Sequence, residues 1–304
     1  MYSYDSLILR LKEKGLTKTD LTEKAGVSSR TIAKISRHEK IAPHVMKRIA
    51  KFLDADPEEL YQIISDNPVL QRLRDEKEIR LPGGLYHELQ VRLTYNSNHI
   101  EGSKLSLDQT RMIFETKTIE AGGGVLVDDV LETVHHFRAI DYVIDHAEDG
   151  LTEEFIKKLH YILKHDTSDS LLSWFAVGDY KKRPNTVGGE KTVTPAEVGS
   201  RMNKLLKEYH SLDFVNIREI VRFHAEFEKI HPFQDGNGRV GRLIALKECL
   251  HHHIVPFLIE DTKKQFYYRG LREWPEQSGY LMDICLDGQD TFRALFKLFE
   301  IEYE

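Results

Sequence analysis

The chain has 304 residues, which is enough for one large domain or for two, each with its own core. Hydrophobic residues make up 40% and charged residues 30%, and no apolar run approaches the roughly 18 residues of a membrane helix, so we expect a helical globular protein without membrane contact. Two cysteines, Cys249 and Cys285, exclude a disulfide framework, and without an evident secretory leader we expect a cytoplasmic protein.

The charge is unevenly distributed along the chain. The net charge is −6, yet residues 1–53 hold 12 Lys/Arg and five Asp/Glu. A basic head on an acidic body predicts that only the head meets a polyanion. A solvated helical surface would explain the same charges.

Residues 1–65 have the pattern of several short helices. One is expected to begin near Thr17 and the next at Ser28, a favourable N-cap, with Gly26 in the turn between them. Residues 42–64 predict two more, which makes five. The arrangement resembles the repressor-type helix-turn-helix family, the Cro group. The matching positions are Leu21, Ala25, Gly26, Val27, Ser28, Ile32 and Ile35.

This resemblance implies that the helix after Gly26 enters a groove of double-stranded DNA. The residues implied to face the groove are Ser28, Ser29, Arg30, Thr31 and Lys34. Repressor-type heads bind DNA as dimers, so a homodimer is compatible with the resemblance. A helical interaction module that does not bind DNA is the alternative.

Residues 66–85 predict a connector that ends at the Pro-Gly-Gly of residues 82–84. Helical patterns dominate from residue 86 to residue 304. The exception is residues 183–194, where two β-prone runs flank Gly188-Gly189 and predict a β-hairpin.

The stretch HPFQDGNGRVGR, residues 231–242, contains the G-x-G-x-x-G string of dinucleotide-binding sheets. That fingerprint needs a preceding strand, but residues 217–230 have apolar residues at helical spacing. A P-loop is excluded because no Gly-Lys-Ser/Thr follows. The pattern is therefore helix, loop, helix, and His231 is expected to end the first helix because Pro232 cannot continue it.

The loop carries groups that suit a polyphosphate. Gly236 and Gly238 allow the backbone to approach a ligand, and Asp235 offers a carboxylate to Mg²⁺. Arg239 and Arg242 are three residues apart in the first turns of the second helix, where positive charge opposes the helix dipole. A bound anion would relieve that conflict, so we predict a polyphosphate site.

The string HPFQDGNGR, extended by Val240-Gly241-Arg242, resembles the signature of Fic-domain proteins. The resemblance spreads over residues 86–304 and includes SNHIEG, VGDYKKRPNTVGG, HAEFEKIHPF and FYYRGL. It implies an all-α domain with a small β-hairpin flap, placed after the five-helix head. It also implies transfer of AMP from ATP to a hydroxyl of a target protein, which could be the chain itself.

Residue by residue, the resemblance makes His231 the general base toward a target Ser, Thr or Tyr. Asp235 is implied to hold Mg²⁺ or Mn²⁺, and Arg239 and Arg242 to contact the β- and γ-phosphates. The flap is implied to align the target segment by strand pairing. The other implied nucleotide contacts are Gly236, Asn237, Gly238, Val187, Gly188, Gly189, Glu190, Tyr267 and Tyr268.

Ser97 and Glu101 are four residues apart, so they share a helix face, and Gly102 suits the end of that helix. Ser-x-x-x-Glu-Gly resembles the inhibitory motif of the Fic family, and it implies that Glu101 pairs in a bidentate way with Arg242 at the γ-phosphate position. We therefore expect an autoinhibited AMP transferase. Two alternatives stay open: removal of AMP by the same site, and a transcription regulator that senses nucleotide.

Overall fold

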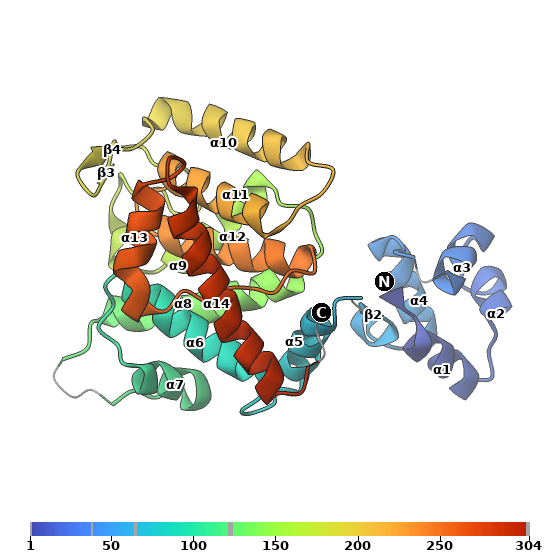
Figure 1. Cartoon of the computed structure of the whole chain (residues 1–304). Helices are drawn as coiled ribbons and strands as arrows, with labels where there is room; N and C mark the ends of the chain where they lie inside the picture. Colours follow the sequence, from blue (N-terminus) through green and yellow to red (C-terminus); the bar gives the residue numbers. More distant parts are fainter. Residues whose placement is uncertain (1, 38, 64–65, 121–123, 302–304) are drawn as a thin grey trace. The chain divides into compact units, whose positions relative to one another are not determined.

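The computed structural model describes residues 2–37, 39–63, 66–120 and 124–301. The chain divides into two compact units, Met1–Gln71 and Arg72–Glu304, and each is described by itself (Figure 1). The predicted domain boundary at residue 65 lies outside the described residues. Within the described ranges, no helix is both long enough and apolar enough to cross a bilayer.

The first unit consists of short helices around one apolar core. Its elements are β1 (Tyr2–Ser3), α1 (Asp5–Glu13), α2 (Lys18–Glu23), α3 (Ser29–Ser36), α4 (Pro43–Leu53), the 3-10 helix η1 (Pro57–Leu60) and β2 (Gln62–Ile63). The predicted starts of α2 and α3 are confirmed, because Thr17 and Ser28 cap them and Thr17 forms a capping box with Asp20. The predicted fifth helix is reduced to η1, since the chain then extends and β2 pairs antiparallel with β1.

The predicted connector, residues 66–85, is largely helical. α5 (Pro68–Ile79) begins after Asn67, whose side-chain oxygen accepts hydrogen bonds from two backbone amides of the first turn, 3.0 and 3.2 Å away. The helix buries Val69, Leu70 and Leu73. A capped start and apolar residues at helical spacing thus give most of the predicted connector a helical structure before the Pro-Gly-Gly that ends it.

The second unit is a helical domain around α12. Its elements are α6 (Leu85–Ile100), α7 (Leu107–Thr116), α8 (Val127–Asp145), α9 (Glu153–Lys164), η2 (Ser168–Leu171), β3 (Thr186–Val187), β4 (Glu190–Lys191), α10 (Pro195–His210), α11 (Ile217–Ile230), α12 (Asn237–His251), η3 (Asp261–Lys263), α13 (Lys264–Arg272) and α14 (Ser278–Leu298). α12 packs against α6, α8, α9 and α11 (Figure 1). It is buried from Asn237 to Leu250 except at Gly238, so its charged residues must be neutralised inside the domain.

The predicted hairpin is present between α9 and α10. Thr186 pairs with Lys191 and Val187 with Glu190, across a two-residue turn. The turn residues are Gly188 and Gly189, and both have the positive φ that a tight hairpin turn of this kind requires. All four strand residues are exposed, so the hairpin leaves backbone edges open to another chain.

Candidate active site

The loop between α11 and α12 is shaped by its backbone and by one side chain. His231 ends α11 in the left-handed conformation (φ 51°), Pro232 follows, and Gly236 (φ 78°) precedes α12, as predicted. The Asn237 Oδ1 atom accepts a hydrogen bond from the Phe233 N–H at 2.8 Å, and its Nδ2 donates to the Phe233 carbonyl at 2.9 Å. Both polar atoms of the Asn237 side chain therefore hold the loop.

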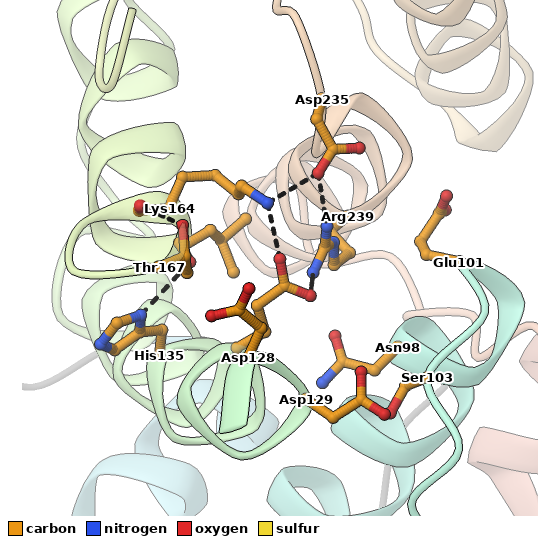
Figure 2. A network of polar contacts seen from close by, with 12 residues as sticks. Asn98, Glu101, Ser103, Asp128, Asp129, His135, Lys164, Thr167, Asp235 and Arg239 are labelled. Carbon is orange, nitrogen blue, oxygen red and sulfur yellow. Dashed lines mark hydrogen bonds and ion pairs between the residues drawn. The ribbon is translucent and has the colours of Figure 1, made fainter. Parts of the chain in front are cut away.

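Asp235 and Arg239 belong to a partly buried ion network that the sequence analysis missed (Figure 2). The Oδ2 atom of Asp235 accepts from Lys164 Nζ at 2.7 Å and from Arg239 Nη2 at 3.2 Å. Arg239 also pairs with Glu132 of α8, whose other oxygen lies 2.6 Å from the Lys164 ammonium. Burial raises the pKa of Asp235, but the charges of Arg239 and Lys164 outweigh it and hold that pKa well below its usual value. The Asp235 carboxylate is thus ionised, as a metal ligand must be.

Arg242 lies one turn after Arg239 and is buried against the end of α6. Its Nη2 donates to Glu101 Oε1 at 2.7 Å and to the Ser97 carbonyl at 2.9 Å, and its Nε donates to the Ser97 hydroxyl at 3.0 Å. Glu101 is the C-cap of α6, and Gly102 follows with a φ of 107°. The structure brings Ser97, Glu101 and Arg242 together as expected. It shows one hydrogen bond to Glu101, from Nη2, in place of the expected bidentate pair, while Nη2 and Nε also donate to Ser97.

Gly238 provides the space for this ion pair. A Cβ at this position would lie 2.1 Å from Glu101 Oε1 and 3.0 Å from Arg242 Nη1. A second carboxyl, Glu228, lies nearby, and its burial, together with the charge of Glu101, raises the pKa of Glu228 to about 8. Glu228 is therefore mainly protonated at neutral pH, and the carboxylate of Glu101 forms the ion pair with Arg242.

The adjacent tyrosines Tyr267 and Tyr268 support the same region. Tyr267 is 1% exposed, its hydroxyl lies 2.7 Å from His224 Nε2, and the Arg242 guanidinium carbon lies 5.8 Å from its ring centroid. The Tyr267 side chain is thus buried beside Arg242, where the resemblance implies a nucleotide contact. Tyr268 is partly exposed, and its hydroxyl donates to the Ile100 carbonyl at 2.9 Å, at the end of α6.

The imidazole of His231 is neutral at physiological pH. Burial, and then the positive charge of Lys181, lower the pKa of His231 to about 4. Lys181, which the sequence analysis missed, joins the hairpin to the loop. Its Nζ donates to Asn185 Oδ1 at 2.8 Å and to Thr192 Oγ1 at 2.6 Å, while its backbone N–H donates to the Pro232 carbonyl at 2.9 Å.

Comparison with known families identifies both units. Residues 150–249 match the model of the Fic/DOC family, a range that includes the loop and Lys164. The chain contains a Fic/DOC domain. Residues 7–66 match the Cro/C1-type HTH DNA-binding domain, so the first unit is a helix-turn-helix domain.

Individual relatives extend the likeness beyond the matched range. Proteins named protein adenylyltransferase Fic from Aedes aegypti and Drosophila melanogaster are 26% and 25% identical over 251 residues, or 80% and 81% of this chain. The chain spans about half the length of these curated relatives, 46% and 47%.

Solved structures confirm the predicted helical fold. A Fic domain containing signaling protein from Bacteroides thetaiotaomicron has a TM-score of 0.61 at 23% identity, covering 78% of this chain and 99% of that one. Fic-1 from C. elegans has a TM-score of 0.55 at 18% identity, covering 92% of this chain and 79% of that one.

The Fic/DOC domain offers donors that suit a phosphate. Among the described residues, Arg239 Nε and Arg242 Nη1 are buried without a hydrogen-bond partner, which is costly for charged groups. The first backbone amides of α12 also lack intrahelical acceptors. In the described part of the chain no three His, Cys, Asp or Glu side chains cluster as a metal site. Asp235, whose side chain is half exposed, fits a Mg²⁺ ion that takes its other ligands from phosphate and water.

The predicted recognition helix of the helix-turn-helix domain is α3. The Ser28 hydroxyl accepts a hydrogen bond from the Thr31 N–H at 3.2 Å and lies 3.0 Å from the Thr31 hydroxyl, so both side chains are engaged in the helix cap. Ser29 and Arg30 are exposed and Lys34 is half-buried.

Proposed function

We propose that this chain is a protein adenylyltransferase that transfers AMP from ATP to a Ser, Thr or Tyr hydroxyl of a target protein. One observation carries the proposal. Arg239 and Arg242 lie side by side at the start of α12, after the loop that bears His231, and each has a buried nitrogen without a partner in the described chain. Such donors suit the oxygens of a phosphate group, and the names of the curated relatives support ATP as the source of that group.

His231 acts as the general base. Its pKa of about 4 keeps the imidazole unprotonated at neutral pH, so it can accept the proton of the target hydroxyl. The hydroxyl oxygen attacks the α-phosphorus, the bond to the bridging oxygen breaks, and pyrophosphate leaves with the electron pair. Arg239, Arg242 and the backbone amides of Gly236–Gly238 stabilise the phosphate charge as it develops. Asp235 would hold Mg²⁺ or Mn²⁺, which when bound neutralises phosphate oxygens.

The hairpin aligns the target. Its strand residues from Val187 to Glu190 are exposed, and an extended segment of another chain can pair with such an edge through backbone hydrogen bonds. The Asn185 amide donates to the Phe233 carbonyl at 3.1 Å, so the hairpin and the loop are joined at their bases. A target hydroxyl held on the hairpin would thus be presented to His231.

Glu101 inhibits the transfer. Its carboxylate occupies Arg242, which is the contact proposed for the γ-phosphate, so ATP binds productively only when Glu101 leaves. Incubation with labelled ATP tests both proposals. Wild type should label itself weakly, Glu101→Gly strongly and the double variant Glu101→Gly/His231→Ala not at all. Equal labelling of wild type and Glu101→Gly would contradict the inhibition, and labelling without His231 would contradict the base.

The position of Glu101 also supports a second reaction in the same site. A carboxylate beside the phosphate contacts could orient a water that removes AMP from a modified protein. Release of AMP from an AMP-modified target by wild type, and its loss in Glu101→Gly, would favour removal over transfer.

The helix-turn-helix domain supports a DNA-binding role for the first unit. A regulator that only senses nucleotide would bind DNA in an ATP-dependent way without covalent labelling, and a gel shift on the DNA upstream of its own gene separates it from the enzyme. Both cysteines, Cys249 and Cys285, are free and buried, which suits the reducing cytoplasm in which we place the protein.

A further inference from the structure

Lys164 is a buried cation that has no role in the reaction proposed above. It is the last residue of α9, its side chain is 2% exposed, and its ammonium contacts three carboxylates. These are Glu132 Oε1 at 2.6 Å, Asp169 Oδ2 at 2.8 Å and Asp235 Oδ2 at 2.7 Å. An ammonium has three donors, so the whole donor capacity of Lys164 is directed at α8, η2 and the loop.

Asp235 is held on one side. Lys164 and Arg239 both donate to its Oδ2, at 2.7 and 3.2 Å, and Figure 2 shows the other oxygen directed away from both cations. Half of the Asp235 side chain remains exposed. A carboxylate that is bound through one oxygen presents the other in a fixed direction, whereas an unbound carboxylate can rotate or chelate an ion with both oxygens.

We propose that Lys164 is a positioning residue for the proposed AMP transfer: it fixes Asp235 so that Oδ1 alone faces the divalent cation that accompanies ATP. Lys164 acts through Asp235 and touches neither the nucleotide nor the ion. Because it also shares Glu132 with Arg239, it holds the metal-binding acid and a phosphate-binding arginine in one arrangement. A lysine with a structural role alone would affect stability and leave metal affinity unchanged.

The test compares Lys164→Met with its parent, both in the Glu101→Gly background. Mn²⁺ binding is measured by electron paramagnetic resonance with a non-hydrolysable ATP analogue, and self-labelling is measured against metal concentration. We expect metal affinity to fall by about 10- to 100-fold, the range for residues that orient a metal ligand. Labelling at saturating metal and analogue binding without metal should both change much less than metal affinity.

A matched control is available on the same helix. Lys157 also contacts two carboxylates, Glu153 and Asp179, both at 2.9 Å, but it lies outside the network, so Lys157→Met should keep the parent's metal affinity. If Lys164→Met does not fold, the double variant Lys164→Met/Asp169→Asn removes one charge of each sign and serves instead.

Two results would overturn the role of Lys164: unchanged Mn²⁺ affinity in a folded variant, or an equal loss in Lys157→Met. Intact binding of Mn²⁺ and analogue without any labelling by Glu101→Gly would contradict the proposed transfer. The binding data would still decide whether Lys164 positions Asp235.

Discussion

Removal of the Glu101 carboxylate should strengthen productive ATP binding by about tenfold or more. The bond from Arg242 to Glu101 is 2.7 Å long, and the two side chains are 4% and 29% exposed. A hydrogen bond between charged groups contributes about 1.5–3 kcal/mol, and the partial exposure of Glu101 places this bond near the lower end, at about 1.5–2 kcal/mol. ATP must break the bond in wild type but not in Glu101→Gly. Since 1.4 kcal/mol corresponds to a factor of ten, affinity should rise by roughly 10- to 30-fold.

Isothermal titration with a non-hydrolysable ATP analogue and Mg²⁺ measures this difference. Glu148→Gly is the control, because Glu148 forms an ion pair of the same length with Arg74, 2.7 Å, with side chains that are 34% and 14% exposed. Both variants should lose some thermal stability, and only Glu101→Gly should gain affinity. The competition for Arg242 is refuted if Glu101→Gly binds as weakly as wild type, or if Glu148→Gly gains as much.

Three further predictions address the base, the glycine and the DNA-binding head. In a pH–rate profile, the labelling rate of Glu101→Gly should rise through about pH 4 and stay level at neutral pH, because His231 is neutral above its pKa. Lys181→Met should move this rise to higher pH, because it removes a cation that lowers the pKa of His231. A rise centred near pH 6.5 in Glu101→Gly would contradict the role of His231 as a base with a lowered pKa. Gly238→Ala should increase self-labelling over wild type, because its Cβ would lie 2.1 Å from Glu101 Oε1 and displace that carboxylate. If the double variant Gly238→Ala/Glu101→Gly is inactive, Gly238 is needed for nucleotide binding instead. Lys34→Ala should weaken DNA binding and, in gel shifts at several salt concentrations, reduce the salt slope by about one, whereas an unchanged slope would exclude a phosphate contact.

Features that depend on neighbouring residues were predictable from the sequence. Pro232 requires that α11 end at His231, and the glycine at 236 permits the left-handed turn into α12. The hairpin follows in the same way from the paired glycines at 188–189 between two β-prone runs. In each case a proline or a glycine restricts or permits particular backbone conformations at or next to its own position, so the local backbone follows without knowledge of the tertiary structure.

Side-chain partners that are distant in the chain could not be derived from spacing. Arg242 and Glu101 are 141 residues apart, and only the family resemblance pointed to their contact. Lys164 and Asp235 are 71 residues apart, and the sequence did not predict their contact. One local signal existed: Ile156, His160 and Lys164 are spaced by four and all three are buried, so the lysine lies on the inward face of α9. A lysine on such a face requires a buried carboxylate, although the spacing does not say which one.

The two arginines of α12 are neutralised in different ways, and this difference decides which contact can be regulated. Arg239 is held by Glu132, within α8, and by Asp235, and Lys164 contacts both of these carboxylates. Releasing Arg239 would therefore break several ion pairs at once. Arg242 is neutralised by Glu101, which stands at the end of α6 before a glycine with a φ of 107°. A side chain at a helix end can move without breaking the helical hydrogen bonds before it. In the proposed function, ATP would therefore exchange with Glu101 at Arg242 while the network around Arg239 stays intact, which would confine the regulated contact to the end of α6.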